Sequence, residues 1–312
     1  MRMPRPQGGR KTNIDMTEGV IWKQLLLFFF PILFGTFFQQ LYNMADTIIV
    51  GRYVGANALA AVGSTGTIMF LIVGLAQGIT AGFTVLTSQR FGAKDTNGVK
   101  RSVANGILLS LISTFLLTTF SVLSMHWILT KMNTPANIFQ DAYTYIMIIS
   151  GGLITTIFYN LLSSYLRAVG NSQIPLVFLV FSAVLNVILD LILIIKFRMG
   201  VAGAGYATIL SQGISAVLCF LYIYRYMPDL TPQKEHWKFH LADTRHQLSV
   251  GIPMALQFAI TASGTMIMQS AINLFGSDAV ASFTAAGKLQ NIFSTVFVAF
   301  GATIATYVGQ NR

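Results

Sequence analysis

The chain has 312 residues, of which 54% are hydrophobic and only 10% are charged. Charged residues make up about a quarter of a typical soluble domain, so this composition excludes an ordinary soluble globular protein. The net charge of +10 comes from basic residues in short stretches between apolar segments, which is typical of membrane proteins and not of a nucleic-acid-binding surface.

Eight apolar segments are long enough to cross a bilayer as helices, which takes about 20 residues each. Helices are expected because open strands would leave backbone groups unpaired in lipid. The predicted fold class is therefore all-α, a polytopic membrane helix bundle. In chain order, the predicted helices cover residues 24–51, 58–88, 99–127, 142–166, 174–195, 203–226, 247–275 and 279–308.

Lys and Arg are distributed unevenly between the predicted connections. The tail and the even-numbered loops hold fourteen of them, whereas the odd-numbered loops hold only Arg52, Lys131, Lys196 and Arg198. The positive-inside rule therefore places the N-terminus in the cytoplasm. The first helix is longer than the apolar region of a cleaved signal peptide, about 7–15 residues, so we expect it to remain as a signal anchor. The predicted location is the cytoplasmic (inner) membrane.

An internal repeat relates the first two predicted helices to the last two. Residues 54–60 (VGANALA) resemble residues 275–281 (FGSDAVA) at an offset of 221 (276 − 55), and Pro31 pairs with Pro253 at 222. Six helices separate the copies, an even number, so the repeat is parallel. Chance similarity between two apolar segments is the alternative.

If the repeat is real, two copies after the tail need about 440–460 residues. The chain would then hold a complete first six-helix lobe and the first two helices of a second, parallel-repeat lobe. The predicted organisation is a cytoplasmic tail over 1–23, the N-terminal lobe over 24–227, a cytoplasmic linker over 228–246 and the start of a C-terminal lobe over 247–312.

Polar side chains at lipid depth mark candidate functional sites, because a carboxylate at the bilayer centre costs about 2.5–3.5 kcal/mol on insertion scales. Only two acids qualify, Asp46 and Asp190. Each ends a polar stripe with helical spacing on its own segment. The two stripes are Gln39, Tyr42, Asn43 and Asp46, and Ser182, Asn186 and Asp190. Two other predicted helices, over 142–166 and 203–226, carry polar stripes without an acid: Thr156, Tyr159, Asn160 and Ser163, and Thr208, Ser211, Gln212 and Ser215.

The depths of three of these residues allow them to meet. Asp46 and Asp190 each precede a predicted outer helix end by five residues (51 − 46 and 195 − 190), and Thr208 follows one by five (208 − 203). All three would lie about 7–8 Å from those ends at the rise of an α-helix. Desolvation and repulsion disfavour two charged carboxylates in one pocket, so the pair is expected to bind a proton or a small cation. Helix capping or helix packing is the structural alternative for either Asp.

At these residues the sequence resembles the multidrug and toxic compound extrusion (MATE) family. This resemblance implies two six-helix lobes around a central cavity, with drug export driven by inward movement of protons or sodium. It also implies a first-lobe cation network at Asp46, Asn186, Asp190 and Thr208, with Tyr42 nearby. The matching stretches are 42–51 (YNMADTIIVG), 58–63 (ALAAVG), 186–190 (NVILD), 203–208 (GAGYAT) and 308–311 (VGQN).

The start of the second lobe departs from the family pattern. Some members carry an acidic residue on the seventh membrane helix, which corresponds to the predicted helix over 247–275. Here no Asp or Glu occurs between Asp243 and Asp278, and Gln257 stands roughly at the place of that acid. A second-lobe sodium site on this helix is therefore not expected. Lys288 within helix 8 is costly unless it is paired or hydrated, so it is expected to contact substrate, neutralise an acid or make a structural polar contact. The candidates for substrate contact are Gln39, Asn43, Tyr159, Gln257 and Lys288.

Other features favour structural roles. Gly74, Gly78 and Gly82 form a small-xxx-small ridge that predicts close helix packing. His236 and His240 are spaced i, i+4, but they lack a flanking helical pattern or catalytic motif, so we expect a solvated linker and no zinc site. The single Cys219 lies in an apolar segment, typical of a small buried residue. No nucleotide-binding motif is present, so neither a cofactor nor an ATP-driven pump is expected.

The function that these observations favour is a secondary active transporter, not an enzyme, that exports amphipathic, cationic drugs or toxins in antiport with protons or sodium. A lipid-linked saccharide flippase of related architecture is the alternative, and it would favour basic residues along the cavity. An integral-membrane enzyme would need a reactive constellation, which the Asp pair lacks. The expected partners are a small-molecule substrate and the lipid bilayer, with no nucleic acid and no obligate protein partner.

Overall fold

The computed structural model describes residues 16–17, 19–132, 134–273 and 277–311. In the last two helices, the side chains at 266, 269, 270, 272, 273, 277–289, 291 and 292 lie outside this description. The described residues form helices and no strand. Seven helices are long and apolar enough to cross a membrane, or eight when one bent pair is counted as a single span. The predicted all-α membrane bundle is therefore confirmed.

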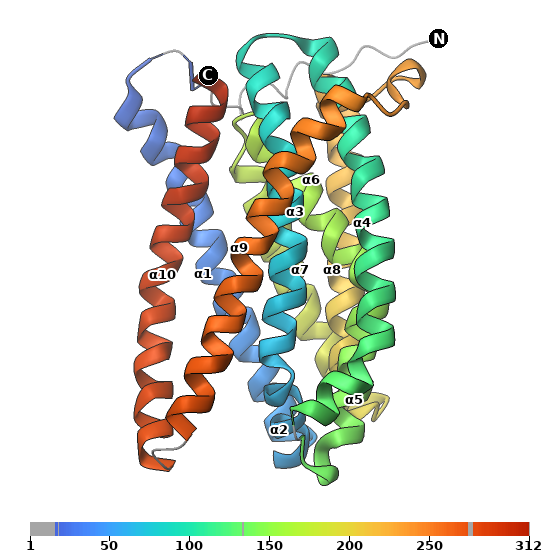
Figure 1. The fold of residues 1–312 in the computed structure, drawn as a ribbon, viewed down its shortest axis with the longest axis vertical. Coiled ribbons are helices and arrows are strands. Elements are labelled where there is room, and N and C mark those ends of the chain that lie inside the picture. The colour runs from blue at the N-terminus through green and yellow to red at the C-terminus, as the bar shows by residue number, and fades with distance from the viewer. Residues whose placement is uncertain (1–15, 18, 133, 274–276, 312) are drawn as a thin grey trace.

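The helices run alternately between two ends of the bundle (Figure 1). We call the end where α1 begins and α10 ends, drawn at the top of Figure 1, the upper end, and the opposite end the lower end. The upper end is the one that the sequence predicts to be cytoplasmic. The elements are α1 (Ile21–Tyr53), α2 (Ala56–Ser64), α3 (Gly66–Gly92), α4 (Thr96–Lys131), α5 (Ala136–Gly151), α6 (Leu153–Ala168), α7 (Gln173–Asp190), the π-helix η2 (Leu191–Lys196), α8 (Gly200–Tyr226), the 3₁₀ helices η3 (Pro228–Leu230) and η4 (Lys234–His236), α9 (Leu241–Asn273) and α10 (Ser277–Asn311).

Three of the predicted helices are interrupted. The segment over 58–88 divides at Thr65 into α2 and α3. The segment over 142–166 bends by 48° between α5 and α6, at Gly152. A Cβ atom at Gly152 would collide with the side chain of Ile209 on α8, so the bend occurs where the backbone packs closely against a neighbour. The segment over 174–195 changes from α-helix to π-helix immediately after Asp190.

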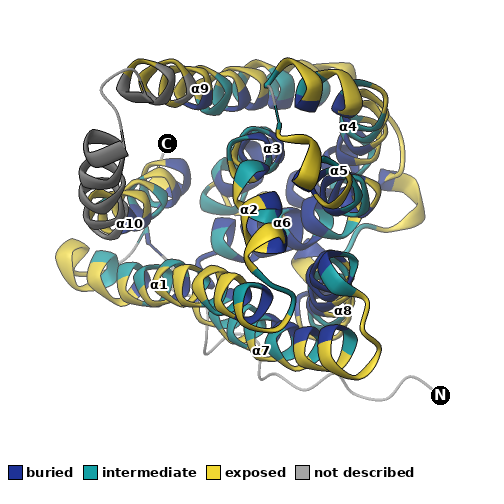
Figure 2. Cartoon of the chain, turned by 90° about the horizontal axis from the view of Figure 1, so that it is seen from below, coloured by how far each residue is buried: buried dark blue, intermediate teal, exposed yellow. Residues whose placement is uncertain are grey.

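The two predicted copies contact each other reciprocally. The first helix of the first copy, α1, packs on α10, and the first helix of the second copy, α9, packs on α3. Phe29 on α1 and Phe300 on α10 meet edge to face, with ring centroids 6.3 Å apart. Figure 2 shows α9 along one edge of the bundle, beside α3 and α4, and α10 at another edge, near α1. The second copy of the repeated motif begins at 275 and 276, which lie outside the described residues.

The glycine ridge predicted to allow close packing lies along the contact between α3 and α9. A Cβ atom at Gly78 would come within 2.7 Å of the Ala255 backbone, and one at Gly82 would collide with the Gly251 backbone. A Cβ atom at Gly74 would lie 3.0 Å from the Phe258 ring. Backbones can approach this closely only where side chains are absent, so the predicted role of the ridge is confirmed.

A buried polar cluster holds the start of α9 against α3 and α4 at the upper end. Arg90 donates two hydrogen bonds to the Asp243 carboxylate, at 3.0 and 2.5 Å, and Arg101 Nε donates a third at 2.8 Å. One turn further along α9, the Gln247 amide donates to two backbone carbonyls of the first lobe and accepts from Asn105 Nδ2 at 2.8 Å. Bidentate and charge-assisted bonds of this kind are the strong ones.

This cluster corrects part of our expectation of a solvated linker, because two of its polar residues are buried although most of the segment over 228–246 is exposed or half-buried. The helix begins at Leu241, six residues earlier than predicted (247 − 241), and both Asp243 and His236 are buried. His236 Nδ1 accepts from the Gln233 N–H at 3.1 Å, and its Nε2 is 2.5 Å from Asn97 Oδ1. Charged residues are depleted in buried positions unless they are paired, and the pairing here comes from residues more than a hundred positions away, which sequence spacing does not reveal.

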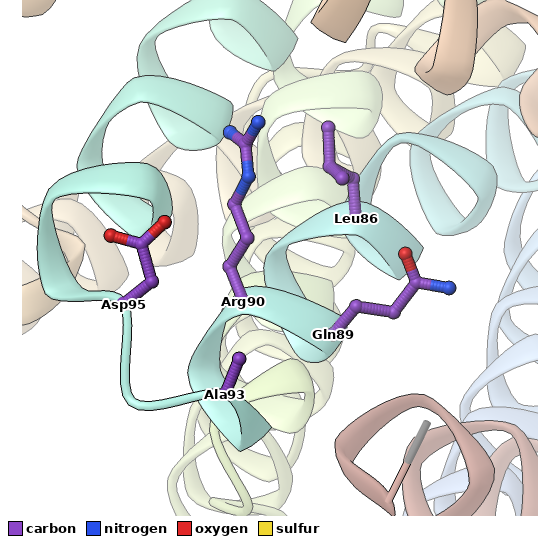
Figure 3. Close-up of a pocket in the computed structure, with 5 residues that line it drawn as sticks. All are labelled: Leu86, Gln89, Arg90, Ala93 and Asp95. Atoms are coloured by element: carbon purple, nitrogen blue, oxygen red, sulfur yellow. The ribbon is translucent and has the colours of Figure 1, made fainter.

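A hollow lies beside Arg90 at the same end of the bundle (Figure 3). Its lining comes from the last turns of α3 and the turn that leads into α4. Asp95 caps α4 by accepting a hydrogen bond from the Gly98 N–H at 2.8 Å. The lining residues are Leu86, Gln89, Arg90, Ala93 and Asp95. None of them is a predicted site residue, and the predicted carboxyl pair belongs to the other end of the bundle.

Candidate functional site

Asp46 and Asp190 face each other where α1 packs on α7. Both are buried, Asp190 completely and Asp46 with 8% of its surface exposed. Their carboxyl groups are close enough to share a hydrogen bond. Asp46 lies seven residues before the end of α1 (53 − 46) and Asp190 six before the end of η2 (196 − 190), so both are about 9–11 Å from the lower helix ends. The structure thus brings the two predicted acids together, in the lower half of the bundle.

The other predicted network residues surround this pair. With its amide turned to satisfy both neighbours, Asn186 Nδ2 donates to Asp190 Oδ2 at 3.1 Å and its Oδ1 accepts from the Thr208 N–H at 3.3 Å. The opposite orientation gives only a 3.5 Å contact with Thr208 Oγ1, so we assign the first orientation. The Tyr42 hydroxyl lies near Thr208 and in the electrostatic field of both carboxyl groups. All five predicted residues therefore form one cluster.

Two carboxyl oxygens in the cluster are without a hydrogen-bond partner. Both Asp46 Oδ1 and Asp190 Oδ1 are enclosed and unpaired. A buried polar atom that is unsatisfied costs about 1–3 kcal/mol, and more when it is charged. Since two ionised carboxylates offer only acceptors, they can share a hydrogen bond only when one carries a proton. The geometry is thus suited to hold a proton or a small cation between α1 and α7.

Tyr145 is a member of the cluster that the sequence prediction missed. It lies on α5, is buried, and its hydroxyl is within the electrostatic range of Asp46, Asp190 and Tyr42. Its neighbours in sequence, Ile146 and Ile149, are also buried. A tyrosine among apolar residues is read as packing.

The predicted substrate contacts do not join the cluster as one group. Gln39 is half-buried and Asn43 exposed on α1, one or two turns from Asp46, and Gln257 is exposed on α9. Lys288 falls in α10, and its side chain lies outside the described residues. Tyr159 is buried on α6, where it faces α8. These residues remain predicted substrate contacts.

Polar side chains also meet between α6 and α8. Thr156 Oγ1 donates to Gln212 Oε1 at 2.5 Å, an offset of 56 residues between the two helices (212 − 156). Both helices run towards the upper end, so the same offset brings Tyr159 beside Ser215 and Ser163 beside Cys219. We call this row of buried polar residues, which continues from Thr208 at the carboxyl pair, the α6–α8 seam.

The chain matches a family model and several curated sequences. The MatE family model matches residues 31–192, more than half of the chain (162 of 312), a range that holds both carboxyl residues. The chain is 33% identical over 300 residues to the probable multidrug resistance protein YpnP of Bacillus subtilis, covering 95% of this chain and 66% of that protein. It is 26% identical to the probable multidrug resistance protein NorM of Thermotoga maritima, covering 93% of this chain and 63% of that protein.

Solved structures share the fold. A MOP superfamily transporter from Pyrococcus furiosus superposes with a TM-score of 0.87 at 23% sequence identity, over 99% of this chain and 67% of that chain. The chain spans 63–66% of the length of the two sequence relatives. Together with the apolar helices, these similarities identify a multi-pass membrane protein.

Proposed function

The chain belongs to the MATE family of transporters, and from this we propose that the protein is a secondary active transporter that exports amphipathic, cationic small molecules in antiport with protons. Two relatives carry the name of multidrug resistance proteins, which supports the proposed substrate class. The chain spans 63–66% of the length of these relatives, and the activity is proposed for the whole protein.

The observation that supports cation coupling is the buried pair of carboxyl groups with two unpaired oxygens. Protonation of one carboxyl removes a buried charge, and loss of the proton restores it. Either step changes the contact between α1 and α7. Because α1 also packs on α10, a change at Asp46 is transmitted along one helix to the contact between the lobes. This gives the proton a route to influence which face of the bundle is open.

Sodium is the competing coupling ion. It prefers oxygen ligands, and hard cations of similar size take about six. Asp46, Asn186, Asp190 and Thr208 supply side-chain oxygens from three helices. We favour the proton because a shared hydrogen bond between the two carboxyls accommodates it directly, whereas sodium needs further ligands from water.

The test is transport by the complete protein in sealed vesicles with a fluorescent organic cation as substrate. In sodium-free vesicles, an imposed pH gradient alone should drive accumulation of the cation against its own gradient. Collapse of the pH gradient with an ionophore should stop accumulation, which controls for passive binding of the dye.

Two outcomes would contradict parts of this proposal separately. Accumulation that requires a sodium gradient and ignores the pH gradient would replace the proton by sodium. Absence of accumulation under either gradient, with folded protein in the vesicles, would reject the secondary-transport mechanism.

A further inference from the structure

The α6–α8 seam is a row of polar groups, most of them buried, between two largely apolar helices. On α8, Thr208, Ser211, Ser215 and Cys219 are all buried and share one face of the helix. They span eleven residues (219 − 208), which is about 16 Å along the helix. The row starts at the carboxyl pair, because Thr208 belongs to that cluster, and it runs towards the upper end.

The middle of the seam contains hydroxyl groups that lack partners. Ser163 Oγ and Ser215 Oγ are both enclosed, and neither completes a hydrogen bond, although the Tyr159 hydroxyl is within reach of Ser163. Buried hydroxyls without a partner are rare, and in proteins they are normally satisfied by ordered water. The seam is therefore a place where water can reside between the carboxyl pair and the upper end.

Such a row could let protons leak through a transporter that must couple proton movement to substrate movement. Water and hydroxyl groups both donate and accept, so a hydrated row next to a site that binds a proton offers a path by which protons can leave without substrate movement. A protein that couples the two movements needs a barrier on that path.

Arg167 lies at the upper end of the seam. It stands one turn beyond Ser163 on α6, is half-buried, and donates from Nη2 to Ser164 Oγ at 2.9 Å. Its electrostatic neighbours are Tyr159 and Cys219, and no carboxylate among the described residues pairs with it. Within the described part of the chain, the guanidinium therefore places a positive charge with no carboxylate partner at the end of the polar row.

We propose that Arg167 is an electrostatic barrier that stops protons and small cations from passing along the α6–α8 seam between the carboxyl pair and the upper end. A fixed cation or an oriented helix dipole excludes protons from a hydrated pore in the same way. The inference rests on the proposed proton coupling for its purpose. Its direct consequence is a low rate of proton leak through the protein, which can be measured without any substrate.

The experiment uses the complete protein in liposomes with an internal pH-sensitive dye and an imposed pH gradient, in the absence of substrate. Arg167→Gln should dissipate the gradient at least about tenfold faster than the parent, a modest effect for removing a unit charge beside a buried path. Arg167→Lys keeps the positive charge and should dissipate the gradient as slowly as the parent. Adding Ser215→Val to Arg167→Gln replaces the unpaired hydroxyl by an apolar group and should return the leak rate to that of the parent.

A second variant leaves Arg167 in place. Ser163→Asp puts a carboxylate one helical turn before the guanidinium and neutralises its field, so it should leak as Arg167→Gln does. Size-exclusion profiles and melting temperatures identify the variants that fold. A folded Arg167→Gln or Ser163→Asp protein that is as tight as the parent would overturn the proposal, and so would equal leaks from the Lys and Gln variants.

A measurement of substrate exchange by the parent protein tests the proposed function independently of the proposal on Arg167. If the parent fails to exchange substrate for protons in the same liposomes, the proposed function is wrong, whereas the comparison of leak rates still decides the role of Arg167.

Discussion

The two carboxyl groups at the centre of the cluster come from positions 144 residues apart (190 − 46) and meet because α1 packs on α7. Each is the end member of a helical stripe, so its own helix already turns it away from lipid. Burying both carboxylates costs free energy, and this cost is offset only when the pair binds a proton or a small cation. The spacing along each helix thus places each carboxyl group on the inner face, and the packing of α1 on α7 brings the two groups together.

Replacing Asp190 by Asn should preserve the fold and remove the coupling. Asn has nearly the same shape and can still accept from the Asn186 amide, but it cannot gain or lose a charge. In the complete protein, Asp190→Asn should lose at least about tenfold of the gradient-driven transport, in line with loss of an essential ionisable group. The measurement is uphill accumulation of a fluorescent cation in vesicles.

The matched control is Asp141→Asn on α5. Asp141 is exposed, so its replacement should leave transport unchanged. Uphill transport by Asp190→Asn at the parent rate would exclude a coupling role for this carboxyl.

The scarcity of acids at lipid depth predicted Asp46 and Asp190, and matching depth added Thr208. The resemblance to the MATE family implied Asn186 and Tyr42 as further members. Neither signal could predict Tyr145, since the ring of a tyrosine packs with its apolar neighbours and its hydroxyl alone joins the cluster. Orientation of the Asn186 amide also required the positions of both neighbours.

At the scale of the elements, the eight predicted segments all exist, and the errors fall at their ends and breaks. Residues 63–67 (GSTGT) carry no large apolar side chain, so the break at Thr65 has a sequence signal that the predicted segment passed over. Apolar composition does continue through the start of η2, so hydropathy gives no sign of that change. The π-helix begins at the residue after Asp190, and such irregular turns are frequent at functional sites. The break at Gly152 depends on close approach to Ile209, which only the packed structure reveals.

The contact between α3 and α9 gives an element-scale prediction. In Gly82→Ala the new methyl group would collide with the Gly251 backbone, so the two helices must separate. Overpacking of this kind costs about 1–3 kcal/mol. We expect a lower melting temperature for the purified complete protein in detergent.

Gly264→Ala on α9 is the matched control, because a Cβ atom there meets nothing within 4 Å. Alanine has the higher helix propensity, so this variant should melt at or slightly above the parent temperature. Equal melting temperatures for Gly82→Ala and the parent would mean that the two backbones are not in close contact.

At the scale of the whole molecule, the reciprocal contacts of α1 with α10 and of α3 with α9 are what two copies of one unit produce when they face each other. The predicted orientation assigns the upper end to the cytoplasm. It can be tested with single cysteines in a background carrying Cys219→Ser, which removes the buried native thiol.

A cysteine at Lys234 should be protected from an impermeant thiol reagent in intact cells, whereas one at Asn57 should be labelled. Both positions are exposed in the structure, on η4 at the upper end and on α2 at the lower end. Permeabilised cells provide the control, since both cysteines should then react. The reverse pattern in intact cells would invert the orientation and with it the side on which the carboxyl pair lies.

The polar cluster at the start of α9 also bears on how the protein is made. Asp243 pairs with Arg90 and Arg101, which leave the ribosome 153 and 142 residues earlier. An 18-residue window of the span that begins at Leu241 has a mean hydropathy of 1.2, against 2.7 for a window of Gln173–Lys196, so α9 partitions less readily into lipid alone. Because domains form in order during synthesis, α3 and α4 can already present their polar groups when α9 emerges. The first lobe then acts as a template on which the second lobe begins its insertion.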